Sequence, residues 1–220
     1  MFSRLADPGG LPPHLFRFFV HLLMLLTFLL VFYGRAEAAS SVTARCASYS
    51  QEVRRAHAFY FGADFPWWYS VAQLRKESAC RDVISRDGVG SEGAAQITFR
   101  LWKTALQKQG ISEVRTRSNH LKAQAYINYD AWQQARRRGA PKLWVAYQIY
   151  NGGPLVLTEI KRAGTVNHAA ARAQCRRRNI TFNNGQVINA CDINYSYSTR
   201  IEAYAKAFRL GADSAAYPFW

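Results

Sequence analysis

The chain has 220 residues, of which 49% are hydrophobic and 20% charged. This composition excludes an intrinsically disordered protein and allows one domain with a substantial core. Lysine and arginine number 29 against 14 aspartate and glutamate residues, so the formal net charge is +15. That excess indicates an anionic partner, such as nucleic acid, anionic lipid or a cell-wall polymer, and charge alone does not choose among them.

The N-terminus resembles an export signal. Residues 18–33 are almost entirely apolar, two arginines come before them, and Ala36 and Ala38 form an A-x-A pattern after them. Residues 1–39 are therefore predicted to be a secretory signal peptide. The apolar run is shorter than the ~20 residues of a comfortable membrane-spanning helix, and an uncleaved signal anchor is the alternative. Either way we expect residues 40–220 to be exported to the periplasm or cell envelope.

All four cysteines follow this segment: Cys46, Cys80, Cys175 and Cys191. An even number in an exported chain predicts two disulfides, for which three connectivities exist. We favour Cys46–Cys80 and Cys175–Cys191, because each pair would hold one end of the domain. Reduced, buried thiols are the alternative for a chain that is not exported. The absence of a close C-x-x-C pair argues against a zinc site.

Helix-compatible sequence covers residues 43–61, and Pro66 marks the expected start of a second helix. This second helix has a predicted buried stripe at spacings of four and three: Trp67, Val71, Leu74 and Ser78. Glu77 follows Leu74 by three residues, so its side chain is expected at the edge of that stripe. Residues 81–93 contain three glycines and no sustained period, which indicates a loop.

Five further helices are expected between Thr98 and residue 177. The first ends at about Gln109, and Ser118 is a candidate cap for a longer one that stops before Gly139. The apolar face of this longer helix is predicted to contain Leu121, Ala125, Tyr129 and Trp132. Pro141 opens a helix that is closed by the sequence Asn-Gly-Gly-Pro, and residues 154–177 are expected to form two more.

The chain ends with a small β element and a last helix. Residues 180–189 are predicted to form a hairpin around Asn184-Gly185. Thr199 and Glu202 form a capping-box pair, which predicts that the last helix starts there with Ile201, Tyr204 or Ala205, and Phe208 on its inner face. The predicted fold class is therefore a mainly α domain with a small late β-hairpin.

Glu77 is a candidate proton donor. A carboxyl group at the edge of an apolar helix face loses hydration, and the negative end of the helix dipole also opposes its ionisation. Both effects raise its pKa towards values that suit a general acid. The nearby cations Arg75, Lys76 and Arg81 oppose the shift, but exposed cations are largely screened. The alternative is a partly exposed glutamate in an ordinary ion pair.

Two distant segments offer partners for Glu77. The small residues before Gln96, which are Gly93-Ala94-Ala95, allow a backbone or a ligand to approach closely. Gln96 itself supplies both a donor and an acceptor. Tyr150 and Asn151 follow an apolar helix and present a hydroxyl and an amide. Taken singly, these segments are also typical of close helix packing and of a helix stop.

Together and in this order, the motifs E-S, G-A-x-Q-I and A-Y-x-x-Y-N-G-G resemble those of the soluble lytic transglycosylases, which cleave bacterial peptidoglycan. The resemblance covers about residues 60–165. It implies a lysozyme-like α-fold in which Glu77 is the single catalytic acid and base. It further implies that Tyr150 orients Glu77 and that the sugar-binding groove is formed or supported by Ser78, Ala95, Gln96, Tyr150 and Asn151.

The sequence also departs from the family pattern. Two extra residues lie between the Glu and Gln motifs, Ala94-Ala95 replaces Leu-Met, and Thr98 stands where Met or Pro is common. The segment from about 165 to 220, with its two cysteines and hairpin, lies outside the family core and is expected to be a disulfide-stabilised extension.

The resemblance implies cleavage of the bond between N-acetylmuramic acid and N-acetylglucosamine, with 1,6-anhydro ends and without a metal or organic cofactor. Peptidoglycan strands are the expected partner, with no specific nucleic acid, and a membrane only through an uncleaved N-terminal segment. One alternative is a muramidase, in which Asp82, Asp87 or Asp130 assists an attacking water. The other is an inactive, cationic wall-binding component of a phage or of a secretion or conjugation apparatus.

Overall fold

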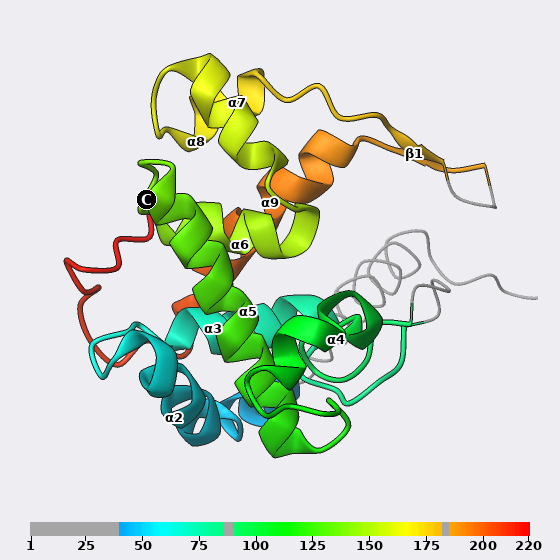
Figure 1. Ribbon diagram of the computed structural model, residues 1–220, viewed down its shortest axis with the longest axis vertical. Coiled ribbons are helices and arrows are strands. Elements are labelled where there is room, and N and C mark those ends of the chain that lie inside the picture. Colours follow the sequence, from blue (N-terminus) through cyan, green and yellow to red (C-terminus); the bar gives the residue numbers. More distant parts are fainter. Residues whose placement is uncertain (1–39, 86–89, 182–184) are drawn as a thin grey trace, which may run out of the picture. The chain divides into compact units, whose positions relative to one another are not determined.

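A computed structural model describes residues 40–85, 90–181 and 185–220 (Figure 1). The chain divides between Ser41 and Val42, and the residues from Val42 to Trp220 form one compact unit. The expected signal or anchor segment, residues 1–39, lies outside the described residues. Within the described ranges, no helix is both long and apolar enough to cross a membrane.

The compact unit is mainly α, as predicted, with a small antiparallel hairpin late in the chain. In the hairpin Ile180 pairs with Ile188 and Thr181 with Val187; Asn184 of the predicted turn lies outside the described residues. A further helical stretch covers residues 40–47. The order of the elements is α2 (Ser50–Phe61), α3 (Trp68–Ser78), α4 (Phe99–Gln107), α5 (Arg117–Arg137), α6 (Leu143–Gly152), α7 (Leu155–Ala163), α8 (His168–Ala173), β1 (Ile180–Thr181), β2 (Val187–Ile188) and α9 (Ala190–Ala205).

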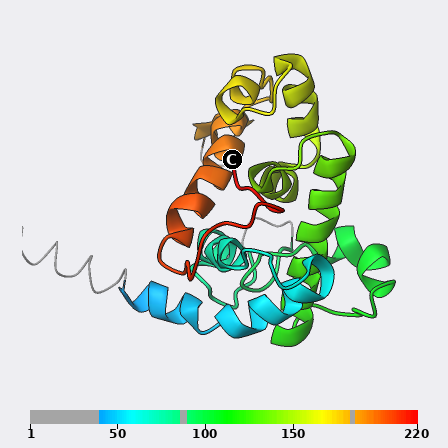
Figure 2. The ribbon, with the colours of Figure 1, turned by 90° about the vertical axis from the view of Figure 1, so that its left-hand side faces the viewer.

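Helices α3 and α6 lie at the centre of the unit. Figure 2 shows them nearly end-on, with α9 on one side and the long helix α5 on the other. Helix α3 packs against α9, α6 packs against both α5 and α9, and α2 covers α5. The predicted stripe on α3 is confirmed, since all four of its residues are buried. Helix α3, which carries Glu77, and helix α6, which carries Tyr150, are therefore held in place by the helices packed against them.

Two predicted helix starts are wrong. Helix α5 begins at Arg117, because Thr116 keeps an extended backbone and its N–H and hydroxyl donate to the Glu113 carboxylate. Ser118 is thus inside the helix. The last helix, α9, begins at Ala190, well before the predicted capping box. Asn189 caps it by accepting from the Cys191 and Asp192 amides at 2.8 and 3.2 Å.

Both favoured disulfides are present. Cys46 and Cys80 have Cα atoms 5.3 Å apart, and those of Cys175 and Cys191 are 5.9 Å apart. The first bond ties the helical stretch 40–47 to the end of α3, three residues after Glu77. The second closes the segment that carries the hairpin. Two disulfides indicate an oxidising environment outside the cytoplasm.

Candidate active site

A cleft of about 380 Å³ lies where α3, α4, α5 and α6 meet the segment that precedes α4. It contains four of the six residues that the sequence singled out: Glu77, Gln96, Tyr150 and Asn151. The lining is completed by Ser91, Ile97, Thr98, Leu101, Trp102 and Ile127. Side chains from three distant parts of the sequence therefore meet around one carboxyl group.

Two other hollows in the described part of the chain are larger but chemically poorer. One of about 780 Å³ runs along α7 and has no acidic residue in its lining. The other, of about 500 Å³, lies between α2 and α5, and its only lining acid, Glu52, forms an ion pair with Arg117 at 2.8 Å. The cleft at Glu77 is therefore the best candidate for catalysis.

Glu77 is the second-to-last residue of α3 and is partly buried. Burial raises the pKa of its carboxyl from 4.5 to about 7, against the opposing effects of a hydrogen bond from Tyr197 and the charge of Lys76. A pKa of about 7 leaves a large share of the carboxyl protonated at neutral pH and most of it protonated below neutral pH. This is the protonation state that a general acid needs before the reaction starts.

The hydrogen bond on Glu77 comes from Tyr197 of α9, whose hydroxyl donates to Oε1. The same hydroxyl accepts from Gln73 Nε2 at 3.2 Å. Gln73 is itself held on α3 by amide donors from α5, Gln124 and Asn128, both at 2.9 Å from its Oε1. Hydrogen bonds between buried side chains of this kind hold Gln73 and the Tyr197 hydroxyl in one orientation. Glu77 is therefore positioned through α9 and α5 as well as by its own helix.

Tyr150 does not donate to Glu77. Its hydroxyl donates to the Ala95 carbonyl oxygen at 2.8 Å, although the charge of Glu77 contributes, after burial, to raising the pKa of Tyr150. The resemblance implied that Tyr150 orients Glu77. In the structure the hydroxyl that donates to Glu77 belongs to Tyr197. Tyr150 instead connects helix α6 to the segment before α4.

Ser78 and Ala95 are buried behind the cleft wall. Ser78 Oγ donates to the Ala94 carbonyl at 2.9 Å, which attaches the Gly93–Gln96 segment to the end of α3. An isolated antiparallel bridge between Glu92 and Ile97 closes the same segment. Ser78 and Ala95 therefore support the groove rather than line it.

His120 of α5 anchors this segment from behind. The Ala95 N–H donates to Nε2 of the ring at 2.9 Å, so the ring proton is on Nδ1, which lies 3.1 Å from the Val114 carbonyl. Burial lowers the pKa of His120, which keeps the ring neutral. Gly93 has φ +70°, and a Cβ at this position would lie 2.3 Å from His120 Cε1. The glycine is thus required both by its backbone conformation and by the ring.

Gln96 lines the cleft from a left-handed backbone conformation, with φ +52°. Its Nε2 donates to the Val83 and Gly93 carbonyls at 2.9 and 2.8 Å, so the amide nitrogen is used to hold the loop. Asn151 lines the cleft from α6, and its Nδ2 lies 3.0 Å from the Asn194 side-chain amide. Both amides are therefore fixed in place by neighbours outside the cleft.

The other candidate acids lie apart from Glu77. Asp82 and Asp130 do not line the cleft, and Asp130 accepts from Gln134 at 2.7 Å. Asp87 lies outside the described residues. Within the described ranges, no group of three or more His, Cys, Asp or Glu side chains is arranged to hold a metal ion.

Sequence reasoning missed Tyr197 and His120. The spacing of the buried α9 residues Asn194, Tyr197 and Ile201 indicates an inward face, and this signal could have selected Tyr197. Nothing local connects it to Glu77, 120 positions earlier. Comparisons of the chain with protein-family models, curated proteins and solved structures gave no match.

Tyr197→Phe is expected to raise the pKa of Glu77 further, because the lost hydrogen bond stabilises the ionised carboxylate. The alkaline limb of the pH–activity profile should move to higher pH. The profile of the purified variant measures this shift, with Tyr204→Phe, a tyrosine further along α9, as the matched control. A limb that stays in place would show that Tyr197 does not act on Glu77.

Proposed function

We propose that this protein is an exported peptidoglycan lytic transglycosylase with a lysozyme-like α domain. The observation that carries the proposal is one carboxyl group, Glu77, with a pKa raised to about 7, in a cleft lined by Gln96, Tyr150 and Asn151. The cleft thus joins the three motifs that resemble the lytic transglycosylases. With no match in the comparisons, the proposal rests on these residues and their geometry.

In this reaction Glu77 donates its proton to the oxygen between N-acetylmuramic acid and N-acetylglucosamine. The 2-acetamido group of the substrate stabilises the positive charge that develops at the anomeric carbon. Ionised Glu77 then takes the proton of the 6-hydroxyl of the same sugar, whose oxygen bonds to the anomeric carbon and closes the 1,6-anhydro ring. A pKa near neutral suits both halves of this cycle. The Tyr197 hydrogen bond stabilises the intermediate carboxylate.

The cleft lining favours this mechanism over hydrolysis by two carboxylates. A retaining or inverting glycosidase holds its second carboxyl group about 5 or about 6.5–9.5 Å from the first. In the described part of the chain, Glu77 is the only acid that lines the cleft. Substrate assistance requires only that one.

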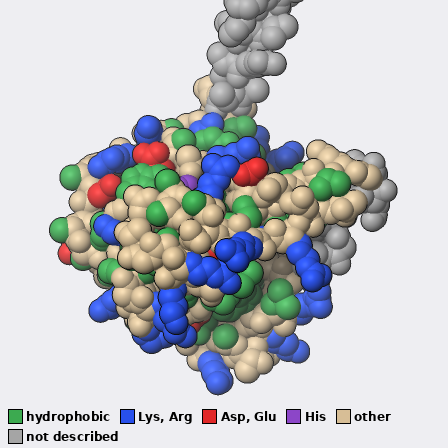
Figure 3. Space-filling model, turned by 90° about the horizontal axis from the view of Figure 1, so that it is seen from above, with side chains coloured by type: hydrophobic (Ala, Val, Ile, Leu, Met, Phe, Trp, Pro, Cys, Tyr) green, Lys and Arg blue, Asp and Glu red, His purple; other side chains and the backbone are tan. Residues whose placement is uncertain are grey.

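The surface charge suits an anionic polymer. Figure 3 shows a face on which Lys and Arg side chains are far more numerous than acidic ones. Peptidoglycan carries the free carboxylates of its peptides, and a net charge of +15 raises the rate of encounter with such a mesh. The two disulfides agree with a place of action outside the cytoplasm.

Mass spectrometry of the muropeptides released from purified sacculi tests the proposal. A lytic transglycosylase gives 1,6-anhydro ends, which are lighter by one water than the reducing ends that a muramidase gives. Reducing ends would replace the proposal with the muramidase alternative. No released product, together with binding to sacculi, would favour the inactive wall-binding component.

A further inference from the structure

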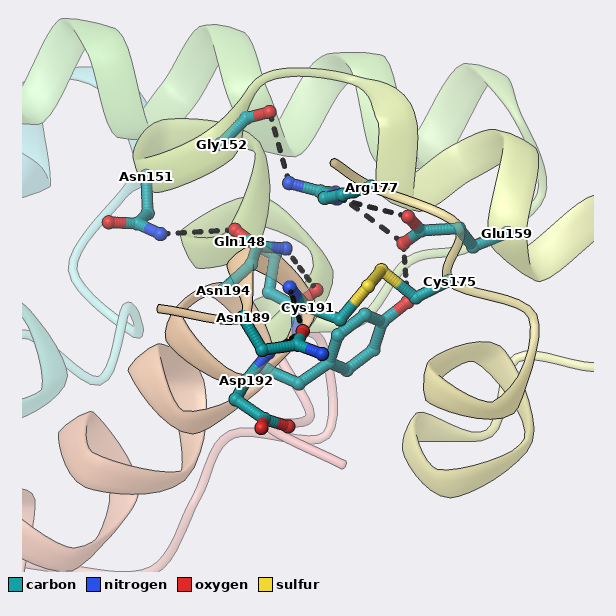
Figure 4. Close-up of polar contacts among 11 residues, drawn as sticks. Gln148, Asn151, Gly152, Glu159, Cys175, Arg177, Asn189, Cys191, Asp192 and Asn194 are labelled. Atoms are coloured by element: carbon teal, nitrogen blue, oxygen red, sulfur yellow. Dashed lines mark hydrogen bonds and ion pairs between the residues drawn. A yellow bond between two sulfur atoms is a disulfide. The ribbon is translucent and has the colours of Figure 1, made fainter. Parts of the chain in front are cut away.

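Arg177 stands out from the basic run to which it belongs. Its neighbours Arg176 and Arg178 are exposed, whereas only 10% of the Arg177 side chain is accessible to solvent. Figure 4 shows that it points inward, between the end of α6 and a carboxylate on α7. The run Arg176–Arg178, which its sequence alone would place on the solvent-exposed surface, therefore contains one buried cation.

The charge of Arg177 is met by Glu159 of α7. Arg177 Nε lies 3.0 Å from Oε1 of this carboxylate, which is almost fully buried, and Nη2 lies 3.4 Å from Oε2. The Tyr195 hydroxyl donates to the same Oε2 at 2.6 Å. A guanidinium held in this two-pronged way has little freedom to turn. The third guanidinium nitrogen, Nη1, is consequently held in one direction.

Nη1 is directed at the end of α6, directly after Asn151 of the cleft lining. Arg177 Nη1 donates to the Gly152 carbonyl at 3.3 Å, next to Asn151 (Figure 4). A Cβ on Gly152 would lie 2.4 Å from Arg177 Nη1 and 2.4 Å from Asn194 Oδ1. The Asn194 side-chain amide lies 3.0 Å from Asn151 Nδ2 and 2.9 Å from Gln148 Oε1, and with its oxygen turned towards Arg177 it accepts from Nη2 at 3.1 Å. The end of α6 is therefore held by two side chains that both come from the C-terminal extension.

The second disulfide fixes both of these side chains. Cys175 precedes Arg177 by two residues, and Cys191 precedes Asn194 by one helical turn. The bond thus joins the segment before β1, which supplies Arg177, to helix α9, which supplies Asn194. Neither Glu159 nor Arg177 reaches the cleft, so their effect on a substrate must pass through Asn151 and Gly152.

We propose that Arg177 is a positioning residue, which holds Asn151 in the cleft wall so that this amide can bind the glycan. The proposal rests on the function proposed above, because it assigns Asn151 to the same substrate. Arg177 does not touch the proton donor. Its loss should therefore weaken substrate binding and leave the chemical step unchanged.

The first test is the double variant Arg177→Met/Glu159→Gln of the full-length chain. It removes both buried charges together, so neither is left unpaired, and it keeps similar volumes. Cleavage of soluble, uncrosslinked glycan strands should show KM raised about tenfold and kcat within about twofold of the parent, with the same pH profile. The control is Arg178→Met, an exposed neighbour, for which KM should not change. An unchanged KM in the double variant overturns the proposal.

Arg177→Lys is the second variant. It keeps a positive charge at position 177, so the Glu159 carboxylate remains paired. A single ammonium group cannot reproduce the fork that also reaches Gly152, so the effect on KM should persist. Because this variant retains the buried pair, it remains informative if the double variant fails to fold. An unchanged KM in a folded Arg177→Lys variant would likewise overturn the proposal.

Hydrogen exchange supplies a readout that needs no activity. The Gly153 N–H bonds to the Ile149 carbonyl at 2.8 Å at the end of α6, and it should exchange faster in both variants. Unchanged exchange there overturns the proposal whatever KM does. If the parent protein does not cleave glycan, the proposed function fails, and the exchange rate alone then decides whether Arg177 holds this segment.

Discussion

Glu77→Gln is expected to abolish glycan cleavage, with a loss of about 10³-fold or more in kcat. A general acid contributes about 10²–10⁴-fold by itself, and here the same carboxyl also acts as the base. Glutamine has nearly the same size and can still accept the hydrogen bond from Tyr197. Binding should therefore survive, so KM is expected to change much less than kcat.

The measurement is the release of muropeptides from sacculi, alongside thermal unfolding of both proteins at the same pH. Glu92→Gln is the matched control, because this acid lies on the segment before α4 but does not line the cleft. We expect the control to retain activity. Cleavage by Glu77→Gln at the parent rate would remove Glu77 from the mechanism.

Features with a local signal could be predicted from the sequence. The buried stripe on α3 follows from spacings of three and four, and the helix stop at Gly139 from a residue that adopts φ +70°. Glu77 was expected to be reluctant to ionise because it lies at the edge of that stripe and near a helix end. Burial is indeed the main cause of its raised pKa. The favoured disulfide pairs are also confirmed.

Features that depend on long-range packing could not be predicted. Tyr197 and His120 act on segments that are distant in sequence, and only the packing of α9 and α5 brings them there. The sequence does not distinguish Arg177 from Arg176 and Arg178, because all three belong to one run of arginines. Only the packing shows that Arg177 is buried while its neighbours are exposed. The last helix start was misplaced because Thr199 Oγ1 donates back to the Tyr195 carbonyl at 3.2 Å inside α9 and caps nothing.

The second large effect is a pH-dependent loss of stability that is caused by Glu77. Its pKa in the folded protein, about 7, is above its ordinary value of 4.5, so the folded state binds the proton more tightly than the unfolded state. The corresponding stabilisation is fully present below pH 4.5 and is lost as the pH rises to about 7. A shift of this size corresponds to about 3 kcal/mol in the free energy of unfolding.

Buried histidines impose the opposite slope in an overlapping pH range. Burial lowers the pKa of His57 from 6.5 to about 4, and the pKa values of His120 and His168 are also lowered. Their contribution is present above pH 6.5 and is lost as the pH falls, because the unfolded state then binds more protons. The total stability curve of the parent protein therefore does not isolate Glu77.

The difference between Glu77→Gln and the parent protein does isolate it, because the histidine contributions cancel. Denaturant unfolding at a series of pH values measures the free energy of unfolding of both proteins. The value for the variant minus that for the parent should increase by about 3 kcal/mol between pH 4 and pH 8. This difference should increase most steeply between pH 4.5 and about 7, the pKa values of Glu77 in the unfolded and folded states, and should be constant above pH 8. A difference that is flat across this range would mean that Glu77 ionises as freely in the folded protein as in the unfolded chain. A carboxyl group of that kind would be a poor proton donor at neutral pH, whatever lines the cleft around it.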